Sequence, residues 1–459
     1  MSKKFLSFLG GGYYKKCIYK CAELPKDKIR EYNTYFIQEA LTEIFCNDWT
    51  EEDEVVIFLT ERAKKENWLE NHNKKIPNTN TYEHRDGLKH DLLRHNYKFA
   101  IKEVNIKDGN NIDEIWENFD IIIKEIEDGD EIIFDITHAF RYIPILALTV
   151  LNYAKSLKNI KVSGIYYGNY EYRNEGYNNP EYDNNEKPIM NLIQFDEILE
   201  WSQAIDSFVK YGNSDHIKKF ANEVLNNSNN KDYYKNDKDL IKNLVNSLND
   251  FTNTVATCRG RNVYSSTQKN SITVAYKKLN NNLNKYMLSD KTTMKPLEHI
   301  IGNIQDVIKD FEPVENREEI INTGLAIVKW SLDNNLIQQA YTALLETMIS
   351  YMCILEGFNY NSREDRAEVK KIYDRIYNEN KNLSNKYISG NLRKELARLV
   401  YKLGIMRNDI NHFGYSFYES DSNIASRDYT QLKQYVENSY NLFKDWIIKE
   451  EKLIKTYGR

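Results

Sequence analysis

Short apolar segments alternate with amphipathic segments in the N-terminal part of the chain, and this alternation restricts the possible folds more than any other feature. The apolar segments, each ending in a glycine or a polar residue, are residues 4–11, 54–60, 98–106, 131–137 and 161–168, and a last one covers 189–195. Runs of this length are typical of buried strands in a mostly parallel sheet. Between them, residues 28–45, 112–126 and 140–157 have helical spacing, the last being apolar nearly all round. We predict a Rossmann-like α/β domain over residues 1–198.

Beyond residue 198 the strand pattern stops and helical periodicity dominates. We expect two helices that meet at Gly212, a loosely structured Asn- and Lys-rich surface segment at 226–270, and further helices over 271–312. Residues 313–459 read as a second helical domain. Its segment 391–414 carries an apolar stripe at core spacing: Leu392, Leu396, Leu399, Leu403, Met406 and Ile410. The prediction is therefore an α/β domain at 1–198, a helical middle region at 199–312 and an all-α domain at 313–459.

Composition excludes several classes of function. The chain has 459 residues and a net charge of −5, so contact with nucleic acid must be local. No apolar stretch approaches the roughly 20 residues of a membrane span, and the five cysteines are scattered, so we expect free thiols and a cytoplasmic protein. His84, His90 and His95 lack acidic or cysteine partners at ligand spacing, and we expect no metal site. No basic recognition helix follows a tight turn, which argues against DNA binding.

Polar residues follow several of the predicted strands. Parallel strands place their carboxyl ends at one edge of a sheet, where ligands bind. The first glycines could admit a phosphate, an arginine could grip it, and a tyrosine could stack on a base. The dinucleotide pattern G-x-G-x-x-G is incomplete because Lys15 replaces its third glycine, so we exclude NAD. The strand-end residues are Gly10, Gly11, Gly12, Tyr13, Thr60, Glu61, Thr137, His138, Arg141, Tyr167 and Gly168.

A second candidate site lies in GIMRNDINHFGYS, residues 404–416, where Arg407 precedes His412 by five positions. Arginine can hold a phosphate oxygen and histidine can transfer a proton near neutrality. On a helical wheel the two residues are not superposed, so two copies of the helix would be needed to complete a site. The same spacing occurs at Arg85 and His90, which we interpret as a solvated surface. A solvated helix end is the alternative at Arg407 as well.

The motifs FLGGGYY, VVIFLTERA, FDITHAFRYIPILA and GIYYG resemble, in order and spacing, the CARF sensor domain of type III CRISPR ancillary ribonucleases. WSQAIDSF and DNNLIQQAYTALLET are similar to helices of the same family, whose C-terminal domain is HEPN. The resemblance implies that a homodimer, or a higher oligomer, binds cyclic oligoadenylate, with the tetra-adenylate favoured over the hexa-adenylate. It adds Phe140 to the ligand-binding residues above.

For the helical domain the resemblance implies a metal-independent endoribonuclease without a cofactor. Arg407, Asn408 and His412 match the HEPN motif, and Asn408 would orient the arginine or the substrate. Single-stranded RNA would be cleaved by its own 2′-hydroxyl to leave a 2′,3′-cyclic phosphate, and DNA would be spared. Two alternatives stay open. The chain could be a nucleotide-binding regulator with an inactive helical domain, or an enzyme that degrades the cyclic ligand through Thr137 or His138.

Overall fold

In a computed structural model, the chain consists of two compact units, residues Met1–Glu197 and Ile198–Arg459. The structure describes residues 2–24, 27–137, 142–171, 185–226, 237–260, 271–289, 295–315, 317–379, 390–415 and 428–457. The division that we predict within the helical part, at residue 312, stays a prediction.

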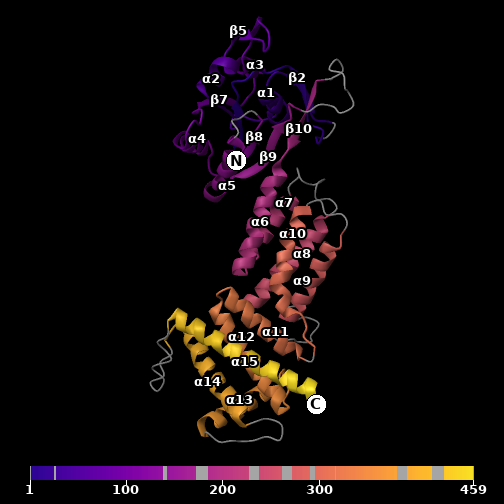
Figure 1. Cartoon of the computed structure of the whole chain (residues 1–459), viewed down its shortest axis with the longest axis vertical. Coiled ribbons are helices and arrows are strands. Elements are labelled where there is room, and N and C mark those ends of the chain that lie inside the picture. The colour runs from indigo at the N-terminus through magenta and orange to yellow at the C-terminus, as the bar shows by residue number, and fades with distance from the viewer. Residues whose placement is uncertain are drawn as a thin grey trace. The chain divides into compact units, whose positions relative to one another are not determined.

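An eight-stranded sheet forms the centre of the first unit (Figure 1). Its strands lie in the order β3-β2-β10-β9-β8-β1-β4-β7, and β5 and β6 form a separate hairpin. The strands are β1 (Lys3–Leu9), β2 (Cys17–Lys20), β3 (Glu31–Thr34), β4 (Glu54–Leu59), β5 (Asn71–Lys75), β6 (Tyr82–Arg85), β7 (Ala100–Asn105), β8 (Glu131–Asp135), β9 (Lys161–Gly168) and β10 (Glu186–Asn191).

The central strands β7, β4, β1, β8 and β9 are all parallel, so their carboxyl ends share one edge. Both faces of β1, β4 and β8 are buried, which explains why their sequences are nearly continuous hydrophobic runs. One face packs on α4 (Ile112–Lys124) and α5 (Ile143–Lys158). The other packs on α1 (Ile37–Leu41), the π-helical turn η1 (Thr42–Cys46) and α3 (Leu88–Leu93). Between β4 and β5 lie α2 (Glu61–Ala63) and a second π-helical turn, η2 (Lys64–Trp68).

The predicted α/β class is confirmed, and five of the predicted strands fall on observed ones. Three sequence interpretations are wrong. Residues 31–34 are strand β3 rather than the start of a helix, and residues 193–195 begin helix α6 rather than ending a strand. Helix α5, although apolar on nearly all sides, is not buried on all sides, because Ile145 is 72% exposed and Leu157 58% exposed. Tertiary packing decides such cases, since short apolar segments have ambiguous periodicity.

The second unit is helical. Its helices pack around one continuous apolar core. The predicted break at Gly212 is confirmed by a left-handed φ of 64° between α6 and α7, and Gly357 ends α12 with a φ of 75°. The helices are α6 (Ile193–Tyr211), α7 (Asp215–Asn226), α8 (Lys238–Ala256), α9 (Ile272–Met287), α10 (Lys295–Ile308) with the 3-10 turn η5 (Lys309–Phe311), α11 (Glu319–Asp333), α12 (Ile337–Glu356), α13 (Arg363–Glu379), α14 (Gly390–Asn411) and α15 (Tyr429–Tyr457).

The expectation that residues 226–270 form a loose surface segment is wrong for residues 238–256. These residues form helix α8, which buries Leu244, Leu248 and Phe251 in the core. Its abundant Asn and Lys residues alternate with apolar ones at helical spacing, so polar composition concealed an amphipathic helix. Among the described residues, no helix has the length and apolar character that crossing a bilayer demands.

Candidate functional sites

A cavity of about 330 Å³ opens at the carboxyl ends of the parallel strands in the first unit. Six of the residues predicted from the sequence line it together: Gly10, Gly11, Gly12, Tyr13, Thr60 and Thr137. The remaining lining residues are mostly apolar or aromatic: Phe8, Leu9, Tyr14, Ile106, Ile143 and Tyr170. A concave site with an apolar floor and a few convergent polar groups is the usual form of a small-ligand site.

The other predicted residues of this site lie outside the cavity lining or outside the described residues. Glu61 is exposed on α2, and Tyr167 and Gly168 belong to the end of β9 without lining the cavity. The backbone N–H of Gly168 donates a 2.8 Å hydrogen bond to Oγ1 of Thr137, so β9 positions a residue that does line it. His138, Phe140 and Arg141 lie outside the described residues.

Two side chains that sequence reasoning did not single out hold the glycine loop, residues 10–12. The buried Asn67 donates from Nδ2 to the carbonyl oxygens of Gly10 at 2.7 Å and Gly12 at 2.8 Å. The Tyr14 hydroxyl accepts from the N–H of Gly10 at 2.9 Å. Asn67 comes from the π-helical turn η2, and such turns occur often at functional sites. The carbonyls are thus tied down on the protein side of the loop.

Arg85 braces the same loop from the hairpin, and our interpretation of it as a solvated surface residue is wrong. Its side chain is buried, and its guanidinium lies 4.6 Å from the ring centroid of Tyr13 and 4.3 Å from that of Tyr35. It also donates a 2.8 Å hydrogen bond to the carbonyl of Tyr14 and pairs with Glu83. Cation–π contacts of this kind orient the aromatic ring as well as stabilise it. Tyr13, a candidate base-stacking residue, is therefore fixed by the hairpin.

A buried carboxylate supports the cavity from below. Asp135, at the end of β8, accepts hydrogen bonds from Ser7 Oγ at 2.6 Å and from the N–H of Thr137 at 2.9 Å. Burial raises the pKa of Asp135, and the two hydrogen bonds act against that rise. The residue sets the backbone of Thr137 and does not line the cavity, so we assign it a positioning role.

The second candidate site lies at the C-terminal end of α14 in the helical unit. The Arg407 guanidinium reaches two partners, Oε1 of Glu346 at 3.5 Å and Oδ1 of Asn408 at 3.5 Å. Its Nε is buried and has no hydrogen-bond partner among the described residues. These long contacts and the unpaired Nε leave donor capacity for a further anion. The sequence motif did not reveal Glu346, which comes from α12.

His412 lies one residue beyond the end of α14 and is exposed. Its backbone N–H still donates to the carbonyl of Asn408 at 2.9 Å, after which Phe413 and Gly414 take left-handed φ values of 59° and 77°. This left-handed pair ends the helix and turns the chain. Phe413 is 90% exposed and Tyr415 77% exposed. Among the described contacts none joins Arg407 to His412.

Beside Arg407, a cavity of about 650 Å³ lies against α11, α12 and α13. Glu346 lines it and also accepts from Arg366 at 2.5 Å, so one carboxylate is shared by two arginines. Arg363 and Lys370 line the same cavity. Among the described lining residues, the three cations Arg363, Arg366 and Lys370 of α13 outnumber the single carboxylate, that of Glu346, so this cavity favours anions.

The fold and the first cavity define a ligand-binding α/β domain that is followed by a helical unit. Residues 4–178 match the family model of the CARF domain of the CRISPR system endoribonuclease Csx1. The chain is also similar to CRISPR-associated protein MJ1674 of Methanocaldococcus jannaschii, with 30% identity over 319 residues that cover 67% of this chain and 41% of that protein. The chain thus spans less than half the length of this relative. It is a CRISPR-associated protein that contains a CARF domain.

Proposed function

We propose that this protein is an endoribonuclease of CRISPR antiviral defence that cyclic oligoadenylate activates and that needs no metal for cleavage. The main support for the proposal is that two features occur in one chain. A CARF domain with a cavity lined by the glycine loop occurs in the same chain as a helical unit that presents Arg407 and an exposed His412 at one helix end. In this proposal the helical domain is a HEPN domain acting on single-stranded RNA in the cytoplasm.

The first cavity suits part of a cyclic oligoadenylate. Ligand pockets range from roughly 300 to 1,000 Å³, so a volume of about 330 Å³ accommodates a nucleotide-sized portion of the ring. The glycine loop lets a phosphate approach the backbone closely, the hydroxyls of Thr60 and Thr137 offer hydrogen bonds, and Tyr13 offers a face for stacking. A symmetric ring then bridges two identical cavities, which matches a two-fold homodimer. Tetra-adenylate is our preferred ring.

Exposed apolar side chains on α4 and α5 support the homodimer. Ile145 is 72% exposed, Leu157 58% and Trp116 59%. Single exposed apolar residues are ordinary, but several on two neighbouring helices of one sheet face are typical of an interaction surface. We propose that a second copy of the CARF domain covers them.

The chemistry at the helical site follows from its groups. The RNA 2′-hydroxyl attacks the adjacent phosphorus, and the 5′-oxygen leaves, which yields a 2′,3′-cyclic phosphate and a 5′-hydroxyl. Arg407 stabilises the extra negative charge on the non-bridging oxygens, and His412 transfers a proton or positions the phosphate. Asn408 orients Arg407. Phe413 and Tyr415 offer exposed rings on which bases can stack, and such stacking tolerates many sequences.

The test is a fluorescent RNA assay in EDTA, with cyclic di-, tri-, tetra- and hexa-adenylate compared. We expect cleavage with one ring size, and His412→Ala should abolish cleavage while ligand affinity, measured by calorimetry, is kept. A wild-type protein that binds a ring but cleaves no RNA would instead favour the nucleotide-binding regulator. Linear products from labelled ring would favour degradation of the ligand. A DNA strand of the same sequence serves as the negative substrate.

A further inference from the structure

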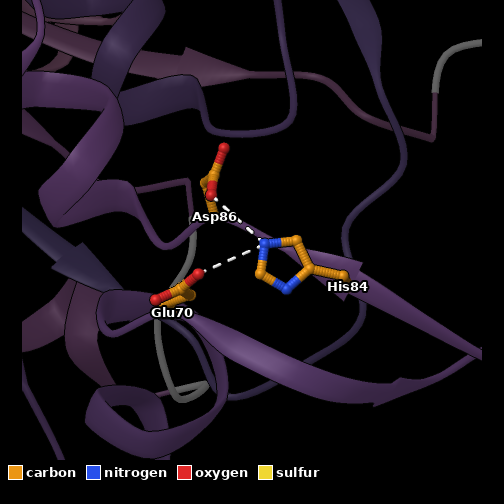
Figure 2. A group of neighbouring side chains, drawn as sticks. All are labelled: Glu70, His84 and Asp86. Atoms are coloured by element: carbon orange, nitrogen blue, oxygen red, sulfur yellow. Dashed lines mark ion pairs between the residues drawn. The ribbon is translucent and has the colours of Figure 1, made fainter.

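A histidine and two carboxylates converge at the open end of the β5–β6 hairpin, away from both candidate sites. Figure 2 shows Glu70 and Asp86 directed at the same ring nitrogen of His84, Nε2. His84 Nε2 lies 3.2 Å from Oε1 of Glu70 and 3.6 Å from Oδ1 of Asp86. All three residues are exposed. Our sequence interpretation that His84 and His90 lack acidic partners is wrong, because the fold brings Glu70, which precedes β5, and Asp86, which follows β6, close to these imidazoles.

The backbone holds these donors in place. Side chains alternate along a strand, so in β6 the buried Arg85 faces the glycine loop while His84 faces the opposite side. Gly87 lies so close to the chain at residues 68–69 that a Cβ atom there would be 2.3 Å from the carbonyl oxygen of Trp68. This close approach fixes Asp86 beside the segment that carries Glu70. The donor set is therefore preorganised by two anchored neighbours, Arg85 and Gly87.

We propose that Glu70, His84 and Asp86 bind a divalent transition-metal ion of the zinc type. Zinc bonds to nitrogen and oxygen of about 2.0 to 2.2 Å give ligand–ligand edges of about 3.3 to 3.6 Å in a tetrahedron. The two separations, 3.2 and 3.6 Å, lie within about 0.1 Å of this range. An imidazole donor favours zinc and its neighbours over magnesium or calcium. Three protein ligands leave one position for water.

A second histidine supports the site from outside it. Nδ1 of His90 lies 3.8 Å from Oδ2 of Asp86, so the carboxylate faces one histidine with each oxygen. Partners of this kind orient a ligating carboxylate and strengthen its binding. Because Arg85 and Glu83 on the same strand hold Tyr13, an ion here would also stiffen the hairpin that braces the glycine loop. The proposal does not depend on ribonuclease activity.

The test uses the full-length protein, stripped with a chelator and dialysed. Zn²⁺ is titrated by calorimetry, and Co²⁺ is titrated by absorption, because four-coordinate Co²⁺ gives far more intense visible bands than the octahedral ion. We expect one saturable site per chain. His84→Ala and the isosteric Glu70→Gln should each weaken binding by at least about tenfold, since even the loss of an outer partner costs that much.

His216→Ala is the matched control, because His216 is a partly exposed histidine of the helical unit with one carboxylate, Glu200, at 3.9 Å. It should leave binding unchanged. Thermal melts confirm that the variants fold, as expected for exposed positions. The proposal is overturned if Zn²⁺ binds with a Kd above about 1 mM, if His84→Ala binds as the wild type does, or if the Co²⁺ spectrum stays that of the octahedral ion.

Discussion

Asn67→Asp tests the glycine loop with a change of almost no volume. Asn67 gives both protons of Nδ2 to the carbonyls of Gly10 and Gly12, and its Oδ1 accepts from Nζ of Lys74 at 2.9 Å. An aspartate keeps the contact with Lys74 but turns a carboxylate oxygen toward the two carbonyls. The glycine loop then loses the two hydrogen bonds that hold its carbonyls, while the residues that line the cavity stay the same.

The expected magnitude follows from two lost hydrogen bonds. At about 1 kcal/mol each, they amount to about 2 kcal/mol. If the ligand must restore this order when it binds, affinity falls about 30-fold, since 1.4 kcal/mol corresponds to a factor of ten. The unfolding temperature of the α/β unit should fall by less than about 8 °C, because the Lys74 contact offsets part of the loss.

The assay is calorimetric titration with cyclic tetra-adenylate, or with whichever ring activates cleavage. Asn249→Asp in the helical unit is the matched control. Asn249 is also buried, with Lys218 donating to its Oδ1 at 2.7 Å, but it lies in the other unit. It should reduce stability without changing ligand affinity. If Asn67→Asp lowers the melting temperature and leaves affinity within twofold, the glycine loop does not bind the ligand.

Three further changes separate the roles of other groups. Arg85→Leu leaves Glu83 half-buried without its cation and should destabilise the protein by about 3 kcal/mol in a urea melt, whereas a surface residue would change it by under about 0.5 kcal/mol. Glu346→Gln frees Arg407 from a partly exposed pair, so stability should change by less than about 1 kcal/mol, while kcat for RNA falls and ligand affinity stays the same. Burial, with Glu39 nearby, raises the pKa of Asp91 to about 6. Because the folded state favours the protonated form of Asp91, this residue contributes to the stability of the protein below about pH 4. The contribution is lost as the pH rises to about 6. In Asp91→Asn this contribution no longer depends on pH. Melts between about pH 4 and 6 should therefore show a loss of stability that is smaller than in the wild type by up to about 3 kcal/mol.

The sequence predicted the parts of the fold that repeat a simple pattern. The parallel strands β1, β4 and β8 are buried on both faces, so they appear as nearly uninterrupted apolar runs. The edge strand β3 and the hairpin strand β6 are short and polar, with exposed residues alternating, and their sequences resemble loops. Such strands form because a neighbour completes their hydrogen bonds, which local sequence does not encode.

The candidate ligand site was predictable in outline because parallel strands end at a common edge. That rule brought Gly10, Thr60 and Thr137 together correctly. It could not identify Asn67 and Arg85, since they act on the loop from a π-helical turn and from a hairpin. The only signal for Arg85 was its position in a polar segment, and polarity there suggested exposure. The sequence did not reveal Glu346 either, because its partner Arg407 lies on another helix.

The arrangement of Arg407 and His412 leads to a test of a shared nuclease site. Arg407 contacts Glu346 and Asn408, while His412 lies past the helix end, exposed and without a contact to Arg407. If each arginine acts with the histidine of the other copy, a mixed dimer of Arg407→Ala and His412→Ala keeps one complete pair. Co-expression with two affinity tags isolates this dimer, which should have about half the wild-type activity because one of two symmetric pairs survives. Each pure variant should be inactive. A mixed dimer as inactive as the pure variants would refute the pairing of each arginine with the histidine of the other copy.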